Sequence, residues 1–191
     1  QKNISYHYDL GNKFYELWLD ASMNYSSGYF ALSSEDLSKA QLNKYQKIIE
    51  PMQLNDRTTL LEIGCGWGGF SSYVAKNFRA KIKAITNSKE QFEYTSKMIS
   101  NEGLNEKVTV EFKDYRDINE KYDYISSIEM FEAVGQKYWS VFFEKIKNCL
   151  NNNGLATLQI ITISEDKREL YQKNQDFIQQ YIFPGGVLPS K

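Results

Sequence analysis

The alternation of apolar and polar positions along the chain predicts strands and helices in turn. Short runs of aliphatic and β-branched residues are typical of buried strands, and amphipathic stretches of helical length separate them. We expect strands over residues 58–63, 81–85, 108–112, 122–128 and 155–163. We expect one helix from the start at Ser33-Ser34 to a point before Pro51, and further helices over residues 70–77, 89–101 and 136–150. This order predicts an α/β fold with a mostly parallel sheet and right-handed crossovers, in which ligands bind at the carboxyl ends of the strands.

Local signals mark several ends of these elements. Ser33 and Ser34, followed by two acidic residues, are typical of a helix start, and that helix must end before Pro51. Ser88 is expected to cap the third helix. The sequence Asn-Asn-Asn-Gly over residues 151–154 predicts a turn before the last strand.

The last part of the chain predicts one more helix, over residues 165–183. Its apolar stripe is interpreted as core packing in preference to a lipid-binding surface. The stripe consists of Leu170, Asn174, Phe177, Ile178, Tyr181 and Ile182. The expected strand at 155–163 is too apolar for a bare sheet edge, so further strands are expected beyond Lys191.

A glycine-rich turn, Gly64-x-Gly66-x-x-Gly69, directly follows the first expected strand. Glycine has no Cβ, so it permits positive φ and lets a ligand approach the backbone amides at a helix N-terminus. This spacing also fits a dinucleotide site, but that site needs an acidic residue at the end of the next strand, where residues 85–88 read Ile-Thr-Asn-Ser. Glu62, two residues before the turn, can instead reach the ammonium group of an amino-acid-like ligand. The pattern favours S-adenosylmethionine (SAM) over a dinucleotide and over a purely structural turn.

Composition narrows the class of protein further. A chain of 191 residues suits one domain, and its net charge of −1 gives no bulk attraction to nucleic acid. The 14 Tyr and 11 Phe residues exceed what a small core needs, so some are expected to line a pocket. Cys65 and Cys149 cannot form a disulfide framework and fit a reducing cytoplasm. No apolar run approaches the roughly 20 residues that span a bilayer, so any membrane contact is expected to be peripheral.

The first 30 residues are rich in Tyr, Asn, Asp and Gly and are expected to cover a site instead of forming a core. A short helix is expected near residues 14–19. His7 is the single histidine, which argues against a histidine metal cluster, and we expect no metal. We interpret His7 as a hydrogen-bonded loop residue in preference to a catalytic one.

Six short sequence motifs, taken together, are informative about the class of protein. They are Tyr6-His7-Tyr8-Asp9-Leu10-Gly11-Asn12-x-Phe14-Tyr15, Tyr25-Ser26-x-x-Tyr29-Phe30, residues 62–69, Thr86-x-Ser88-x-x-Gln91, Phe131-Glu132-x-Val134-Gly135 and residues 181–190. With them the chain resembles, over nearly its whole length, the cyclopropane-fatty-acyl-phospholipid synthase and mycolic acid methyltransferase family. Generic methyltransferases share only the glycine turn. The resemblance implies one Rossmann-like, class I SAM-dependent methyltransferase domain over 1–191, cut short after the fifth strand and the following helix. Within it, 1–32 would be a cover segment, 33–163 the α/β core and 164–191 the start of the acyl-binding region.

The resemblance also implies an activity. The family transfers the sulfonium methyl group of SAM to the cis double bond of an unsaturated phospholipid acyl chain, which yields a cyclopropane or a methyl-branched chain. Expected partners are therefore phospholipid acyl chains at the cytoplasmic, inner surface of a membrane, with peripheral contact, no nucleic acid and a homodimer as the assembly. A dry, apolar pocket rich in aromatic faces suits such chemistry, because water would quench the positive charge that develops.

Individual roles follow from the same resemblance. The residues expected to hold SAM are Tyr25, Ser26, Glu62, Gly64, Gly66, Thr86, Asn87, Gln91 and Glu129, with Tyr115 and Arg116 beside the adenine. Those expected at the catalytic base site, where bicarbonate would act, are Glu132, Gln159, Ser27 and Ile161. Tyr15 is expected at the acyl entrance.

Three positions depart from the family pattern. Ser27 replaces a cysteine beside the base site, Gln159 replaces a histidine, and Ala133 replaces the histidine of Phe-Glu-His-Val-Gly. These changes leave open whether the product is a cyclopropane and whether bicarbonate is used. Two other interpretations stay open: a methyltransferase of another small hydrophobic substrate, and a non-catalytic SAM- or lipid-binding fragment.

Overall fold

A sheet of five parallel strands forms the centre of the computed structural model, which describes residues 11–173, 177–183 and 185–190. The strands are β1 (Thr59–Ile63), β2 (Lys81–Thr86), β3 (Val108–Phe112), β4 (Tyr122–Ile128) and β5 (Leu150–Gln159). Their order across the sheet is β3-β2-β1-β4-β5. The order reverses between β1 and β4, and ligands of such sheets bind beside the carboxyl ends of the strands at this point. The predicted α/β fold with a parallel sheet is confirmed.

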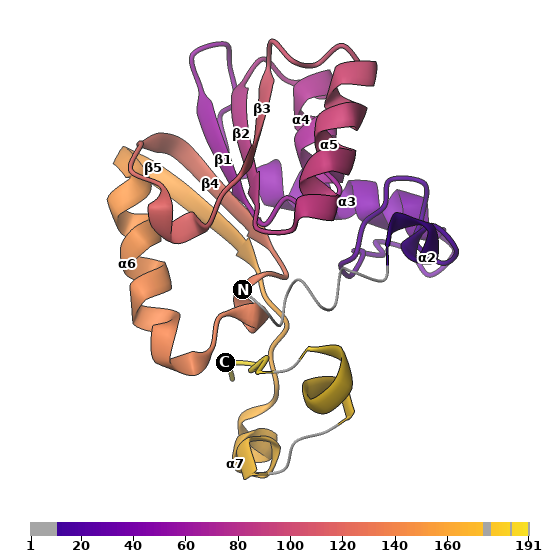
Figure 1. Cartoon of the computed structure of the whole chain (residues 1–191), viewed down its shortest axis with the longest axis vertical. Helices are drawn as coiled ribbons and strands as arrows, with labels where there is room; N and C mark the ends of the chain where they lie inside the picture. Colours follow the sequence, from indigo (N-terminus) through magenta and orange to yellow (C-terminus); the bar gives the residue numbers. More distant parts are fainter. Residues whose placement is uncertain (1–10, 174–176, 184, 191) are drawn as a thin grey trace.

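Helices lie on both faces of the sheet (Figure 1). On one face, α3 (Leu37–Ile49), α4 (Gly69–Asn77) and α5 (Lys89–Asn101) bury side chains such as Tyr45, Phe70 and Ile99 in one apolar cluster. On the other, α6 (Trp139–Cys149) buries Phe142 and Ile146 in a second cluster. Burying one such side chain contributes about 1.5–3 kcal/mol, so these two clusters hold the layers together. The strands supply both clusters because alternate side chains point to opposite faces.

The two cysteines lie in different clusters. Cys65 packs in the α3–α4–α5 cluster, whereas Cys149 packs in the α6 cluster, and both thiols are free. Burial raises the pKa of both thiols. They are therefore core residues on opposite faces of the sheet and not reactive groups.

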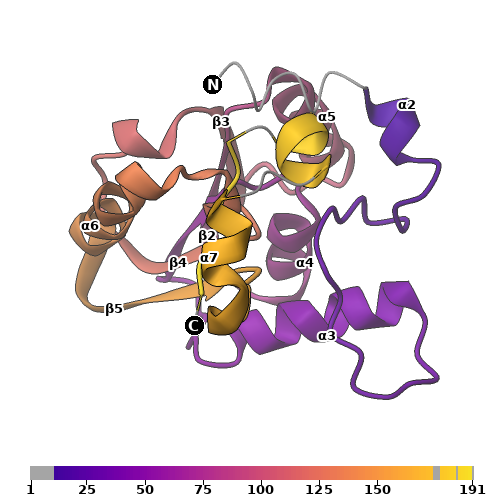
Figure 2. The same ribbon diagram turned by 90° about the horizontal axis from the view of Figure 1, so that it is seen from below.

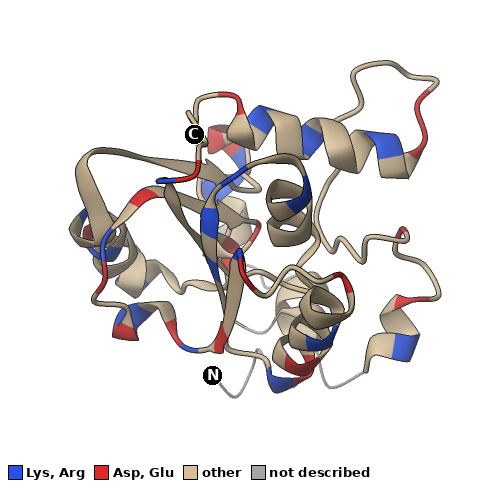
Figure 3. Ribbon diagram, turned by 90° about the horizontal axis from the view of Figure 1, so that it is seen from above, with Lys and Arg blue, Asp and Glu red and all other residues tan. Residues whose placement is uncertain are grey.

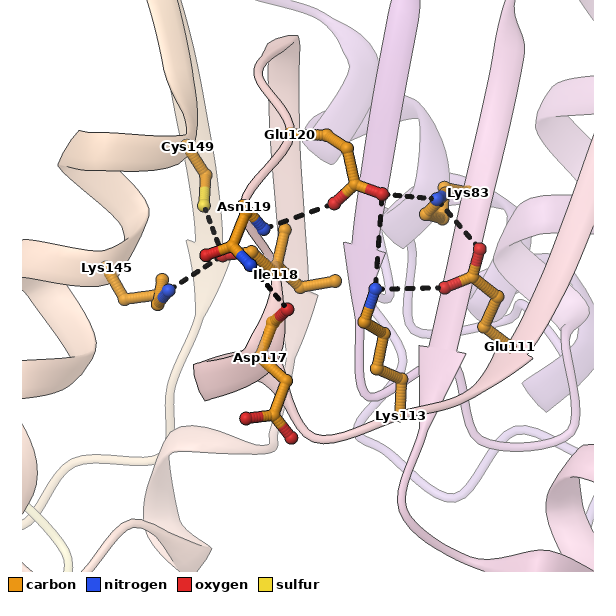
Figure 4. Close-up of polar contacts among 9 residues, drawn as sticks. All are labelled: Lys83, Glu111, Lys113, Asp117, Ile118, Asn119, Glu120, Lys145 and Cys149. Atoms are coloured by element: carbon orange, nitrogen blue, oxygen red, sulfur yellow. Dashed lines mark hydrogen bonds and ion pairs between the residues drawn. The ribbon is translucent and has the colours of Figure 1, made fainter.

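Charged side chains cover the part of the α6 face that α6 does not reach. Lys83 on β2 lies 2.8 Å from Glu111 on β3 and 3.1 Å from Glu120, and Lys113 joins the same group (Figure 4). Lys145 of α6 donates to the carbonyl of Ile118 at 2.7 Å, beside this group. Hydrogen bonds from backbone amides and from Lys83 lower the pKa of Glu120 to about 2. Because these side chains are partly exposed, their ion pairs contribute little to the stability of the fold.

The helix starts differ in detail from the prediction. Asp36, and neither Ser33 nor Ser34, caps α3 by accepting a hydrogen bond from the Lys39 amide at 2.7 Å. Ser88 caps α5 as expected, with its hydroxyl accepting from the Gln91 amide. The helix expected over 136–150 begins with a 3-10 turn, η3 (Gln136–Tyr138), before α6. Two more 3-10 turns, η1 (Tyr115–Asp117) and η2 (Phe131–Ala133), follow β3 and β4.

The turn predicted at residues 151–154 is wrong, because these residues belong to β5. Tyr122 pairs with Leu150, but Tyr124 pairs with Leu155, so extra residues bulge out of β5 at this point. Asn153 sits in the bulge at φ 65°, a left-handed conformation that asparagine tolerates. β5 ends at Gln159 and pairs only with β4 in the described part of the chain, so its other edge has no strand partner there.

Beyond β5 the chain leaves the sheet and passes across the carboxyl ends of the strands. Helix α7 (Glu165–Lys173) and the π-helical segment η4 (Ile178–Ile182) lie here, on the near side of the molecule in Figure 2. The prediction that the apolar stripe packs in the core is wrong, because four of its residues are largely exposed. They are Leu170 (64% exposed), Phe177 (65%), Ile178 (50%) and Tyr181 (59%). Asn174 lies outside the described residues.

The amino-terminal segment packs beside α3 and α4. Its helix α2 (Asn12–Tyr15) is shorter than expected, and Asn12 accepts a hydrogen bond from the Trp67 indole at 2.7 Å. A chain of hydrogen bonds links Tyr45 to Asn24, Ser22 and Asp20. This ties the segment to the glycine turn and to the core.

Side chains of both signs are interspersed on the part of the described chain that Figure 3 shows. Lys and Arg alternate with Asp and Glu on the helices and loops in Figure 3, in agreement with the net charge of −1. No helix in the described part of the chain is both long and apolar enough to cross a bilayer.

Candidate active site

A cavity of about 970 Å³ opens at the carboxyl ends of β1, β2 and β4. The glycine turn, the residues after β2, β3 and β4, the amino-terminal segment and the segment after α7 all line it. Sequence-predicted residues in the lining are Tyr25, Ser26, Ser27, Glu62, Gly64, Gly66, Thr86, Asn87, Gln91, Tyr115, Glu129, Glu132 and Ile161. The topology therefore gathers these residues from distant positions at one place.

The glycine turn is fixed by the elements around it and leaves room for a ligand. The amides of Gly64 and Cys65 both donate to the Ile85 carbonyl, at 3.0 and 2.9 Å, and the Thr95 hydroxyl donates to the Gly66 carbonyl at 3.1 Å. Gly64 and Gly66 have φ values of 78° and 55°. A Cβ on Gly64 would lie 2.7 Å from the Met130 side chain, whereas a Cβ on Gly66 would meet no atom within 4 Å. Gly66 thus presents bare backbone to the cavity, as a closely approaching ligand requires.

Glu62 lies at the end of β1, below this turn. It is only 2% exposed, and its carboxylate accepts a hydrogen bond from the Ser71 hydroxyl. Burial raises its pKa to about 7, although the Ser71 hydrogen bond and the charge of Lys44 act in the opposite direction. A buried carboxylate of this kind is stabilised in its ionised form by a ligand cation.

The residues after β2 offer amide and hydroxyl groups instead of an acid. The Thr86 hydroxyl donates to the Gln91 side-chain carbonyl at 2.9 Å. The side-chain nitrogen of Gln91, Nε2, has no acceptor in the described part of the chain, and both Gln91 and Asn87 line the cavity. An acidic residue at the end of β2, which a dinucleotide ribose would require, is missing.

Glu129, directly after β4, is held by residues that the sequence suggested for the base site. The Ser27 amide donates to its carboxylate at 3.0 Å, the Ser27 hydroxyl does so as well, and the Gln159 amide donates at 2.7 Å. Gln159 also donates to the Ser27 carbonyl at 3.3 Å. Glu129 adopts φ 46°, which is uncommon outside glycine and is stabilised here by these contacts. Gln159 lies outside the cavity lining, and in the described part of the chain its side-chain amide binds Glu129 and Ser27 and donates no hydrogen bond to Glu132.

Glu132, in η2, brings a second carboxylate to the cavity. One oxygen accepts a hydrogen bond from the Ile161 amide. The other, Oε2, is buried and has no partner among the described residues. Burial raises the pKa of Glu132, and the charge of Glu129 adds to this rise. The arrangement suits a group that takes up a proton or accepts a hydrogen bond from a ligand.

Besides Gln159, two predicted site residues lie outside the cavity lining. Tyr15 is fully buried and packs on Trp67 with ring centroids 4.8 Å apart, so it supports the aromatic cluster behind the cavity instead of lining an entrance. Arg116 forms an ion pair with Asp114 at 2.7 Å and is absent from the lining. Tyr115 does line the cavity and packs against Phe142. His7 lies outside the described residues.

The sequence reasoning missed Gln41 and Lys44 of α3. Both are 2% exposed and contact Ser26, a lining residue. One feature of the sequence could have indicated them. Gln41 and Lys44 are polar and three positions apart, and they lie on the same side of the helix as Tyr45 and Ile48, which is the side where apolar residues are usual. Phe183 and residues 185–188 also line the cavity, and they fall in the segment 164–191 that was expected to begin the acyl-binding region.

The fold and the cavity define a class. A parallel sheet with its cavity at the point where the strand order reverses, a glycine turn after β1, an acid at the end of β1 and none at the end of β2 form the class I SAM-dependent methyltransferase fold. The family model described as mycolic acid cyclopropane synthetase matches residues 1–191, and the chain belongs to this family.

Relatives and a solved structure agree with this assignment. The chain is 38% identical over 189 residues to a probable fatty acid methyltransferase of Pseudomonas putida, covering 97% of this chain and 48% of the relative. It is 40% identical over 185 residues to the cyclopropane-fatty-acyl-phospholipid synthase of Escherichia coli strain K12, covering 96% and 46%. The crystal structure of mycolic acid cyclopropane synthase CmaA1 complexed with SAH and CTAB superposes with a TM-score of 0.90 at 29% identity, covering 99% of this chain and 70% of that one. The chain thus spans about half the length of these two curated relatives.

Proposed function

We propose that this chain carries the SAM-binding site of an enzyme that methylates the cis double bond of an unsaturated phospholipid acyl chain. The observation that carries the proposal is one cavity that joins the glycine turn and the buried Glu62 to a second, half-buried carboxylate, Glu132, with apolar side chains around both. The names of the relatives support a lipid substrate. The phospholipid headgroup and the choice between a cyclopropane and a methyl branch belong to the proposal.

The residues present fit SAM. Gly66 leaves the backbone open to a ligand, Glu62 suits the ammonium group of the amino-acid end, and Gln91 offers an amide donor. Tyr115 offers an aromatic face and Glu129 a carboxylate held in place by Ser27 and Gln159. When bound, SAM supplies an electrophilic methyl group on a sulfonium centre.

The rest of the cavity suits an apolar chain. Its lining includes Trp18, Leu37, Ile161, Ile178, Phe183 and Leu188. Tyr25 and Phe183 stack with ring centroids 6.1 Å apart, which brings the segment after α7 against the amino-terminal segment over the cavity. These side chains exclude water, and aromatic faces stabilise a positive charge that develops on the alkene.

Glu132 is the proposed holder of the catalytic base. Its buried Oε2 can accept a hydrogen bond from bicarbonate, whose own O–H is a donor, and the Ile161 amide orients the carboxylate from the other side. Gln159 acts elsewhere, because its amide is bound to Glu129. In this proposal Ser27 and Gln159 support the SAM site, and Glu132 and Ile161 form the base site.

Mass spectrometry of lipids tests the function. Cells that express the protein should contain acyl chains heavier by one carbon, whereas cells without it should not, and a cyclopropane differs from a saturated methyl branch by two hydrogens. SAM binding without any change in the lipids would contradict the proposed reaction and favour a binding role or another small hydrophobic substrate.

The protein is also proposed to contact the inner membrane surface peripherally. Support comes from the side chains of Leu170, Phe177 and Tyr181, which are exposed. Their sequence neighbours Tyr171 and Ile178 line the cavity, so an exposed apolar surface lies close to the proposed acyl site. Cosedimentation with phospholipid vesicles is the measurement. Phe177→Glu should weaken it, whereas Phe143→Glu on α6 should not, and equal binding of all three proteins would contradict this contact.

A further inference from the structure

Lys44 of α3 is a buried cation beside the cavity. It is 2% exposed, and its ammonium donates to the Ser26 hydroxyl oxygen at 2.7 Å and to the side-chain carbonyl of Gln41. Gln41 in turn donates its amide to the Ser26 backbone carbonyl at 2.8 Å. Two side chains of one helix therefore hold a single residue of the amino-terminal segment, and that residue lines the cavity.

The direction of the first hydrogen bond decides what Ser26 can do. An ammonium group can only donate, so the Ser26 oxygen accepts and its own proton points elsewhere. That proton has no acceptor in the described part of the chain, and Ser26 lines the cavity. The hydroxyl is therefore available as a donor to a ligand, and the ammonium behind it makes it a stronger one.

A buried ammonium without an ion pair is costly to the fold. Lys44 forms no ion pair with a described carboxylate. Burial lowers its pKa to about 8, although the charges of Glu129, Asp20 and Glu62 act to raise it. Groups with perturbed pKa values cluster at functional sites, and Lys44 contacts the cavity residue Ser26.

We propose that Lys44 is a positioning residue that turns the Ser26 hydroxyl toward the cavity and supplies positive potential to a ligand carboxylate there, namely the carboxylate at the amino-acid end of SAM. This inference rests on SAM as the ligand in the proposed function. In this arrangement Glu62 binds the ammonium group of the amino-acid end, and Ser26, positioned by Lys44, binds its carboxylate.

The test compares two ligands by calorimetric titration. S-adenosylhomocysteine carries the amino-acid carboxylate, whereas 5′-methylthioadenosine lacks the whole amino-acid end. Lys44→Met should weaken S-adenosylhomocysteine binding about 10-fold or more, because the Ser26 hydroxyl loses its orientation and the ligand carboxylate loses the positive potential. Methylthioadenosine binding should stay unchanged. Ser26→Ala should show the same selective loss. Lys47→Met is the matched control, since Lys47 lies on the same helix and only pairs with Glu50 at the surface.

The outcomes separate the possibilities. Equal losses for both ligands in Lys44→Met would show a merely structural role and overturn the proposal, as would no loss for either. If Lys44→Met does not fold, Ser26→Ala decides, and unchanged S-adenosylhomocysteine affinity in that variant overturns the proposal. If the unaltered protein binds neither ligand, the proposed function itself fails.

Discussion

The side-chain amide of Gln159 donates a hydrogen bond to the carboxylate of Glu129 at 2.7 Å. The two residues lie at the carboxyl ends of the neighbouring strands β5 and β4, and the Glu129 amide also donates to the Gln159 carbonyl at 2.9 Å. The end of β5 thereby fixes a carboxylate that the sequence assigned to SAM. A substitution at Gln159 should therefore act first on ligand binding.

Gln159→Leu should weaken S-adenosylhomocysteine binding about 10-fold, because Glu129 loses a donor to its charged group. Gln159→His should keep most of the affinity, since an imidazole N–H can replace the amide donor. Calorimetric titration measures both. Gln46→Leu, at an exposed position of α3, is the matched control. Full affinity in Gln159→Leu would show that Glu129 does not need this contact.

Gly66→Ala should lose ligand binding while the protein stays folded. Gly66 and Gly103 both have positive φ, 55° and 68°, and a Cβ at either meets no atom within 4 Å. Alanine at either position should therefore lower the free energy of unfolding by about 1–2 kcal/mol. Only Gly66 lines the cavity, so only its variant should also lose S-adenosylhomocysteine affinity. Denaturant unfolding and titration measure the two effects, and a similar affinity loss in Gly103→Ala would contradict this explanation.

Glu62 should make ligand binding depend on pH. Burial raises its pKa from 4.5 to about 7, so the folded protein holds a proton there that the unfolded chain has released between these values. The stability that Glu62 contributes is therefore present below pH 4.5 and is lost as the pH rises through 7. A ligand ammonium favours the ionised carboxylate, so affinity should rise from pH 6 to pH 8. The charge of Lys44 also acts on Glu62, and burial lowers the pKa of Lys44 to about 8, so affinities measured up to pH 7.5 report mainly on Glu62.

Glu62→Gln tests this assignment directly. The variant should bind S-adenosylhomocysteine about 10-fold more weakly at pH 7.5, and its affinity should no longer rise between pH 6 and pH 7.5. It should also lose less stability than the unaltered protein over the same range. Titration and thermal unfolding at several pH values provide the data. If affinity still rises with pH in Glu62→Gln, the titrating group is not Glu62.

Glu132→Gln should reduce methyl transfer on the order of 100-fold, the scale typical of general-base catalysis, with little change in S-adenosylhomocysteine affinity. The reason is the buried Oε2, which loses its capacity to accept a hydrogen bond from a bound base. Turnover on vesicles of cis-unsaturated phospholipid, with and without added bicarbonate, is the measurement. Glu144→Gln, at an exposed position of α6, is the control. A turnover rate that changes neither with added bicarbonate nor in Glu132→Gln would contradict the assignment of the catalytic base to this site.

The sequence by itself determined the elements of the fold and the position of the glycine turn. The expected bounds of β3 and β4 agree with the structure, and α5 begins after its Ser88 cap as predicted. These features depend on periodicity, caps and glycine, which act between residues close in the chain. The same local logic failed at residues 151–154, because asparagine and glycine suit a bulge within a strand as well as a turn.

Only the tertiary structure decided which side chains meet. Ser27 contacts Glu129 across 102 positions and Gln159 contacts Ser27 across 132, so strand order and the path of the amino-terminal segment set these contacts. Packing likewise buried Tyr15 behind the cavity and left Phe177 exposed. Lys44 shows the physical reason most plainly. Its spacing on α3 places it on the buried side of a helix, but its role depends on Ser26, 18 positions away, which only the folded chain brings within hydrogen-bonding distance.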